Sequence, residues 1–226
     1  MKLRAVVGFA LYVMLSFGIL FVAAGTPAWP MAWVYAGLSL VMILGSRLLV
    51  WCKWPDALRE RGQFTEAEGI QSWDRLLSFV VGLLGPTVVG IVAGLDHRFG
   101  SSPNLPDGVV AVATLLVAGG FGVGAWAMVS NRYFSSVARI QRDRGQSVMR
   151  GGPYRFVRHP AYAGALLSGL ATPVMLSALW AWVPAVGTMI AVVIRTRLED
   201  RMLREGLEGY ADYAGVTRHR LIPGVW

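Results

Sequence analysis

The sequence of 226 residues has few cysteines, few histidines and few charges. Its one cysteine, Cys52, excludes an intramolecular disulfide and a metal site built from several cysteines. The three histidines, His97, His159 and His219, are far apart on separate predicted loops, which gives little support to a histidine metal site. Charged residues make up 15% of the chain, against about 25% in an average soluble domain. We therefore expect no metal site and a protein that is not soluble.

In place of charge, the sequence has apolar residues, which make up 55% of it and gather in five long runs. Each of the first four runs reaches or approaches the roughly 20 residues that cross a bilayer core. The first also has the form of a signal peptide, because Lys2 and Arg4 precede it and small residues end it. Further runs follow, however, so the pattern favours an all-α, polytopic integral membrane bundle. Its four single spans are predicted at 5–24, 31–46, 76–95 and 108–130.

The segments that separate these runs are alternately rich and poor in basic residues. Lysine and arginine number 2 before the first run, none in 25–30, 5 in 47–75, 1 in 96–107, 7 in 132–158 and 6 in 195–220. The positive-inside rule therefore places both termini and the 53–75 and 131–159 loops in the cytoplasm, with the protein in a plasma or inner membrane. Topology and contact with anionic lipid account for the net charge of +8, so we expect no nucleic-acid partner.

The fifth apolar run, 161–194, has basic cytoplasmic segments on both sides and must therefore turn back on itself. Its 34 residues are enough for two short helices, and Pro173 and Pro184 bracket the most plausible reversal, 174–183. We predict a single membrane domain over 1–226. Helices in 1–130 precede a region, 131–226, that contains this C-terminal hairpin and a small cytoplasmic site.

Three polar segments meet at the predicted cytoplasmic face: GGPYRFVRHPAYAG at 151–164, the end of the hairpin at 195–201, and the tail at 210–226. Charged hydrogen bonds from arginine and histidine, stacking on tyrosine rings and close approach at glycine would suit a ligand there. The same residues also fit a purely structural role. In that role arginine contacts lipid phosphate, histidine caps the helix before Pro160, and the tyrosines form an interfacial belt. The candidates are Gly152, Tyr154, Arg158, His159, Tyr162, Gly164, Tyr210 and Tyr213.

Arg195 and Glu199 are a second feature, at the point where the hairpin gives way to the charged tail. The spacing i, i+4 puts both side chains on one face of a helix, where they can pair or share a ligand. An exposed pair of this kind is also the ordinary pattern of a solvated helix face. Spacing alone leaves both interpretations open.

Five motifs together resemble the C-terminal half of the isoprenylcysteine carboxyl methyltransferases, their bacterial relatives and the phospholipid N-methyltransferases. The resemblance covers roughly residues 140–226, and it departs from the family at Asp200, where a second glutamate is usual. That departure leaves the role of this position open. The motifs are GPY at 152–154, VRHPAYAG at 157–164, RTRLED at 195–200, GYADY at 209–213 and RLIP at 220–223.

The resemblance implies S-adenosylmethionine as the cofactor and a lipophilic acceptor that enters from the bilayer. It implies catalytic roles for Arg195 and Glu199, and it adds Arg220 to the cofactor-binding candidates. We expect methyl transfer to a carboxylate, as in the isoprenylcysteine enzymes, with phospholipid N-methylation as the alternative. An NADPH-dependent membrane reductase, suggested by the Arg-His-Pro motif, and a non-catalytic lipid-binding protein are further alternatives.

Overall fold

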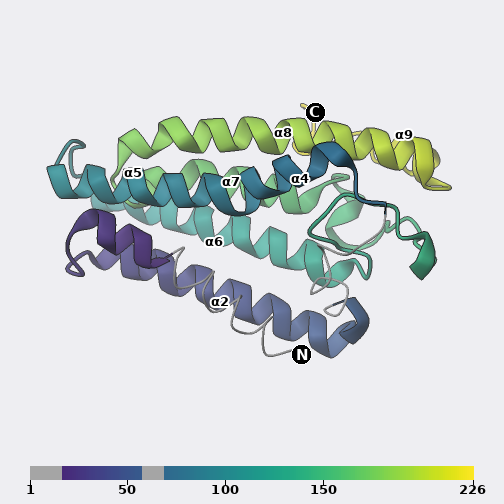
Figure 1. Ribbon diagram of the computed structural model, residues 1–226, viewed down its shortest axis with the longest axis horizontal. Coiled ribbons are helices and arrows are strands. Elements are labelled where there is room, and N and C mark those ends of the chain that lie inside the picture. The colour runs from purple at the N-terminus through teal and green to yellow at the C-terminus, as the bar shows by residue number, and fades with distance from the viewer. Residues whose placement is uncertain (1–16, 58–68) are drawn as a thin grey trace.

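The computed structural model describes residues 17–57 and 69–226, and this part of the chain is helical and contains no strand (Figure 1). The helices are α2 (Pro30–Lys53), α4 (Ser72–Phe79), α5 (Gly85–Phe99), α6 (Asp107–Ser130), α7 (Pro160–Met175), α8 (Trp182–Gly206) and α9 (Tyr210–Val216). A π-helix, η1 (Val80–Leu84), joins α4 to α5 without a break. Three short 3-10 helices complete the described elements: η2 (Arg142–Arg144), η3 (Gly152–Arg155) and η4 (Leu179–Ala181).

Four of the described helical segments are long and apolar enough to cross a membrane: Pro30–Lys53, Ser72–Phe99, Asp107–Ser130 and Leu179–Gly206. Large apolar side chains lie exposed along them, as expected where the solvent is lipid. The prediction of an all-α, polytopic membrane bundle is confirmed. The first predicted span, 5–24, lies mostly outside the described residues, although 17–24 is helical.

The fifth apolar run forms the predicted hairpin. Helix α7 ends at Met175 and α8 begins at Trp182, so the reversal lies inside the predicted 174–183. The Asp96 carboxylate at the end of α5 fixes this turn, because it accepts the Trp180 amide at 3.0 Å and the Ser102 hydroxyl at 2.6 Å. Helix α7 therefore begins, and α8 ends, at the same end of the bundle.

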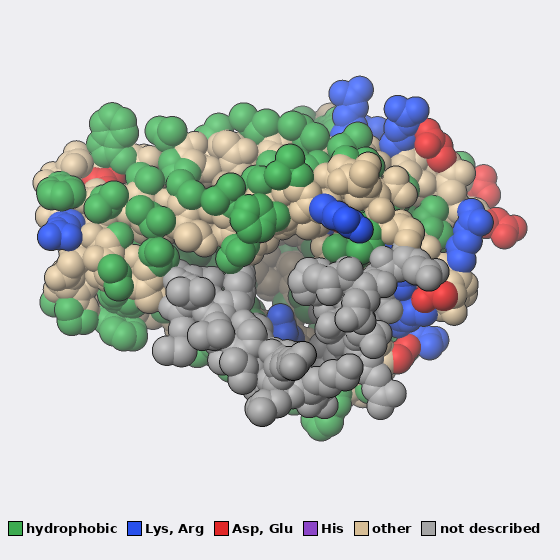
Figure 2. Space-filling model, in the orientation of Figure 1, with side chains coloured by type: hydrophobic (Ala, Val, Ile, Leu, Met, Phe, Trp, Pro, Cys, Tyr) green, Lys and Arg blue, Asp and Glu red, His purple; other side chains and the backbone are tan. Residues whose placement is uncertain are grey.

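We call this end, where α7 begins and α8 ends, the polar end. Helix α9 and the 131–159 loop also lie there (Figure 1). Figure 2 shows charged side chains gathered toward this end, whereas hydrophobic side chains cover the length of the bundle. The arrangement agrees with the charge pattern from which the topology was predicted. The side of the membrane that the polar end faces stays a prediction.

Helices α6 and α7 pack with their backbones in contact. A Cβ atom added at Gly120 would lie 2.5 Å from the Gly164 carbonyl oxygen and 2.7 Å from the Ser168 amide nitrogen. Small residues allow such an approach between helices in lipid, where close packing rather than water exclusion drives association. Gly164 therefore serves helix packing within the bundle, and its approach to a cofactor stays a prediction.

Candidate active site

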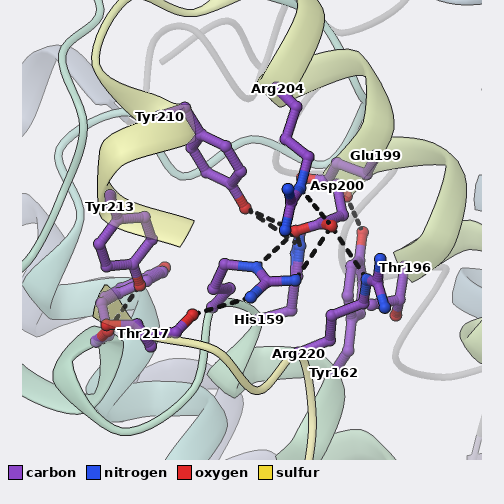
Figure 3. Close-up of polar contacts among 12 residues, drawn as sticks. His159, Tyr162, Thr196, Glu199, Asp200, Arg204, Tyr210, Tyr213, Thr217 and Arg220 are labelled. Atoms are coloured by element: carbon purple, nitrogen blue, oxygen red, sulfur yellow. Dashed lines mark hydrogen bonds and ion pairs between the residues drawn. The ribbon is translucent and has the colours of Figure 1, made fainter. Parts of the chain in front are cut away.

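The Asp200 carboxylate is the centre of the polar end, and its side chain is only 1% exposed (Figure 3). Its Oδ1 accepts Arg158 Nε at 2.7 Å and the Tyr210 hydroxyl at 3.0 Å. Its Oδ2 accepts Arg158 Nη2 at 3.1 Å, Arg220 Nε at 2.9 Å and Arg204 Nε at 3.2 Å. The residue at which the sequence departs from the family thus has a clear structural role. It joins α8 to the start of α7 and to the tail.

Arg158 is buried and has hydrogen bonds at each of its three side-chain nitrogens. Besides Asp200, it donates through Nη1 to the carbonyl oxygens of Thr217 and Arg218, at 2.8 and 2.7 Å. Burial by itself would lower the pKa of Arg158, but hydrogen bonding and attraction to Asp200 raise it above the ordinary value, so the guanidinium stays charged. These contacts favour a structural role, fastening the tail to α8, over the predicted contact with a cofactor carboxylate.

His159 and Tyr210 complete the contacts of Asp200. His159 Nε2 lies 3.4 Å from both Asp200 Oδ1 and the Tyr210 hydroxyl, and its ring stacks on that of Tyr162 at 5.9 Å between centroids. Burial, and then the neighbouring Asp200 carboxylate, raise the pKa of Tyr210, so its hydroxyl keeps its proton and donates it. His159 is also the residue before the first turn of α7, but its side chain makes no capping hydrogen bond there.

Tyr154 and Tyr213, two further candidates, are joined by a hydrogen bond from a side chain to the main chain. The Tyr213 hydroxyl donates to the Tyr154 carbonyl oxygen, and burial raises the pKa of Tyr213 to about 12. The Tyr154 hydroxyl lies 3.4 Å from the Ala127 carbonyl oxygen of α6. Gly152 has a φ of 60°, and a Cβ atom there would lie 2.6 Å from the Ser130 hydroxyl. These three candidates hold the 131–159 loop against α6 and α9.

A second cluster forms around Arg195, which is buried in α8. Its Nε donates to Asp74 Oδ1 at 2.7 Å, and its Nη2 donates to Asp74 Oδ2 at 3.3 Å and to the Ser136 carbonyl oxygen at 2.9 Å. The Tyr162 ring lies 5.4 Å from the guanidinium carbon, and the Tyr162 hydroxyl donates to Glu199 at 2.6 Å. Arg195 thus pairs with Asp74 rather than with Glu199, and Tyr162 contacts both members of the predicted pair.

Asp74 and Arg204 are the polar residues that the sequence interpretation missed. Asp74 has no exposed surface and also accepts the Ala138 amide at 2.6 Å and the Ser78 hydroxyl at 2.9 Å. A carboxylate two residues before an apolar run was the available signal, because an acid beside a membrane span usually has a basic partner. For Arg204 the signal was its position four residues after Asp200 on the same helix.

The segment from α6 to the end of α8 matches a known protein family. Residues 109–208 match the family model described as phospholipid methyltransferase. This segment is similar to a family of methyltransferases. The match confirms the resemblance predicted from the sequence, and it contains Asp200, Arg195 and Glu199 as well as the α6–α7 contact. No curated protein matches the chain.

Proposed function

We propose that the protein transfers a methyl group from S-adenosylmethionine to a lipophilic carboxylate acceptor at the cytoplasmic face of its membrane. The observation that carries the proposal is the methyltransferase-family segment, whose two polar clusters lie together at one end of a membrane-spanning bundle. When bound, the cofactor supplies a methyl group on a positively charged sulfur, and the transfer requires neither a metal nor a covalent enzyme intermediate. The chain's own task is to hold the cofactor and the acceptor, to align them, and to exclude water.

The residues at the polar end fit the zwitterionic amino-acid part of this cofactor, which needs cations for its carboxylate and an acceptor for its ammonium. Arg204 and Arg220 each donate one hydrogen bond to Asp200, through Nε. Their terminal nitrogens have no hydrogen bond within the described part of the chain. Their side chains are 43% and 29% exposed, so a ligand can reach them. Glu199 uses one oxygen on Tyr162, which leaves the other to accept from an ammonium group.

This assignment moves the predicted carboxylate anchor from Arg158 to Arg220 and Arg204. Arg158 and His159 would act on the cofactor indirectly, because they hold the Asp200 carboxylate that orients both exposed arginines. Tyr210 would act in the same way through its hydrogen bond to Asp200. These residues would therefore influence cofactor affinity through position rather than contact.

Arg195 would hold the acceptor. Asp74 and the Ser136 carbonyl fix the plane of its guanidinium, and Nη1 makes no hydrogen bond to any described residue, so Nη1 is available to a carboxylate oxygen. A carboxylate acceptor is already ionised at neutral pH and needs no general base. Glu199 would keep Tyr162 stacked beside Arg195 and so keep the acceptor aligned.

The family description favours one second candidate, N-methylation of a phospholipid amine. An ammonium acceptor must lose a proton before it can attack, and Glu199 is the carboxylate placed to take it. The two candidates thus differ in what Glu199 does, and in the pH dependence of turnover.

A methyl-transfer assay with labelled S-adenosylmethionine tests the proposal. The purified protein is offered a prenylated cysteine, a fatty acid and phosphatidylethanolamine in turn. Arg201→Ala is the control variant, because Arg201 lies on the exposed surface, where it pairs with Glu205. We expect label on a carboxylate acceptor and normal turnover in the control. Label on phosphatidylethanolamine alone would establish the second candidate. Absence of transfer to all three, together with no heat of binding for S-adenosylmethionine in calorimetry, would overturn both.

A further inference from the structure

Residues 220–226, at the polar end, form a loop that closes on itself. The main-chain oxygen of Trp226 accepts hydrogen bonds from three consecutive amides: Arg220 at 2.8 Å, Leu221 at 2.9 Å and Ile222 at 3.1 Å. Consecutive amides that converge in this way form a concave site for a negatively polarised oxygen. The Trp226 amide in turn donates to the Ile222 carbonyl oxygen at 3.1 Å. Main-chain contacts, which do not depend on the side chain, therefore hold position 226 in place.

The same loop is attached to the bundle at its start. The Arg220 carbonyl oxygen accepts the amide of His159, the residue before α7, at 2.9 Å. The Leu221 side chain is buried and only 3% exposed. The loop can turn back because Gly224 has a φ of 80°, in the left-handed region that favours glycine. The loop therefore has a fixed position beside the Asp200 cluster.

The closed loop brings the Trp226 ring over the guanidinium of Arg220. The distance from the guanidinium carbon to the ring centroid is 5.0 Å. Arg220 Nε donates to Asp200 Oδ2 at 2.9 Å (Figure 3). An indole ring attracts a cation over its face, and a planar guanidinium also stacks on such a ring. Two contacts therefore fix the Arg220 guanidinium, one at Nε and one on its face, and both leave its terminal nitrogens available.

Arg204, the other exposed arginine of this cluster, lacks the contact with a ring. Its Nε also donates to Asp200 Oδ2, at 3.2 Å, but no aromatic ring of the described residues lies over its guanidinium. A ligand that immobilises a free arginine side chain has to overcome the loss of its conformational entropy, whereas a side chain held in advance loses less. Of the two arginines that we assign to the cofactor carboxylate, Arg220 is thus the one already held for binding.

We propose that Trp226 is a positioning residue for the cofactor: its ring holds the Arg220 guanidinium with the terminal nitrogens ready for the carboxylate of S-adenosylmethionine. This inference rests on the proposed function for the identity of the ligand. Trp226 itself has no contact with the reacting atoms. Loss of the ring should therefore weaken the binding of the amino-acid part of the cofactor and leave the maximal rate of methyl transfer unchanged.

Two ligands that differ in the amino-acid part test this inference by calorimetry. S-adenosylhomocysteine carries the carboxylate, whereas 5′-methylthioadenosine has the same nucleoside and sulfur but no amino-acid part. Trp226→Leu keeps an apolar side chain and the main-chain contacts of the loop, but it removes the aromatic face. We expect it to raise the Kd of S-adenosylhomocysteine about fivefold and to leave the Kd of 5′-methylthioadenosine within about twofold. Equal weakening of both ligands, or of neither, would overturn the inference.

A conservative variant and a matched control separate the ring from general packing. Trp226→Phe keeps an aromatic face and should retain S-adenosylhomocysteine affinity within about twofold. Phe156→Leu is the control, because the Arg155 guanidinium lies over the Phe156 ring at 4.6 Å, also at the polar end, and Arg155 has no assigned ligand. It should bind both ligands as the wild type does. Selective weakening by Phe156→Leu as large as that by Trp226→Leu would contradict the assignment of this role to Trp226.

Gly224→Ala displaces the ring without removing it. The added methyl group meets no atom within 4 Å, but the left-handed backbone is unfavourable for a residue with a Cβ atom. We expect the same selective loss of S-adenosylhomocysteine affinity. Gly215→Ala, in α9, also adds a methyl group in open space but has no positive φ, and it should match the wild type. If thermal melting shows that Trp226→Leu does not fold, Gly224→Ala decides, and loss of affinity for both ligands would then reject the inference.

A double variant tests whether Trp226 acts through Arg220. In an Arg220→Gln background, Trp226→Leu should cause no further loss of S-adenosylhomocysteine affinity, because the guanidinium that the ring holds is already absent. A full additional loss would mean that the ring acts elsewhere. In the methyl-transfer assay, Trp226→Leu alone should raise KM for S-adenosylmethionine and leave kcat unchanged, and a fall in kcat with KM unchanged would overturn the inference.

Failure of this inference can be told apart from failure of the proposed function. Wild-type protein that binds neither S-adenosylmethionine nor S-adenosylhomocysteine would overturn both. Wild-type binding that Trp226→Leu leaves unchanged would overturn only the role of Trp226 and retain the methyltransferase.

Discussion

The buried ion pair between Asp74 and Arg195 should make the bundle highly sensitive to the loss of either partner. We predict that Asp74→Asn, which keeps the shape of the side chain, greatly lowers the free energy of unfolding. Asp74 is fully buried and Arg195 nearly so, and their two hydrogen bonds, at 2.7 and 3.3 Å, join α4 to α8. The asparagine leaves a buried guanidinium without its counter-charge and turns an amide donor toward it.

The size of the effect follows from burial. Removing one partner of a buried ion pair costs about 3–5 kcal/mol, mostly because the other charge stays buried. For a chain of this length each kcal/mol lowers Tm by about 2–4 °C, so Tm should fall by roughly 10 °C. Asp56→Asn is the matched control. Asp56 pairs with Arg132 and Arg144 but is 46% exposed, and an exposed pair contributes only about 0–1 kcal/mol.

The measurement is the thermal melting of both variants in one detergent, followed by tryptophan fluorescence. A Tm for Asp74→Asn within about 2 °C of the Asp56→Asn value would refute the reasoning. The double variant Asp74→Leu, Arg195→Met then separates stability from chemistry. Apolar residues of similar volume can replace a buried ion pair without loss of stability, so its Tm should recover in part, although the Ala138 amide loses its acceptor, whereas methyl transfer should not recover.

Three other results are expected. Arg195→Lys loses the planar fork and Glu199→Gln loses a charge, so each should lower turnover at least about tenfold. In calorimetry, S-adenosylmethionine affinity should stay within a few-fold of wild type for Arg195→Lys but weaken for Glu199→Gln, because we assign Glu199 to the ammonium group of the cofactor; near-normal turnover in both would leave the pair a purely structural role. Ser39→Ala removes a buried hydroxyl that has no partner within 17–57 and 69–226, and it should raise the free energy of unfolding by up to about 1 kcal/mol in a melting assay; a fall would contradict this. Single cysteines at Ser101 and Ser147, in a cysteine-free background, should react with an impermeant reagent from opposite sides; labelling from one side would reject the topology.

The spans and the hairpin could be predicted because they depend on local composition. A run of apolar residues long enough to cross a bilayer stays a span whatever it packs against, and the parity of basic loops then requires a reversal in 161–194. The candidate residues of the polar end could be predicted for a similar reason, because they lie in short local motifs.

The partners of those residues could not be predicted. Arg158 meets Asp200 across 42 positions and Arg195 meets Asp74 across 121, and no periodicity in the sequence links positions so far apart. Helical spacing correctly placed Arg195 and Glu199 on one face of α8. It could not reveal that Tyr162, from α7, makes contact with both. Pairing of this kind is decided by which helices pack together, and so by tertiary structure.

The contact between α6 and α7 limits where the bundle can open. Where Gly120 meets Gly164, backbone lies against backbone and no side chain can change rotamer to let the helices part, so the two should move as one rigid body. Helix α2, by contrast, meets α6 through side chains, among them Tyr35 and Phe121, whose ring centroids lie 6.5 Å apart. Opening of the bundle should therefore occur between α2 and this pair of helices, and a crosslink that ties α2 to α6 should slow it without altering the fold.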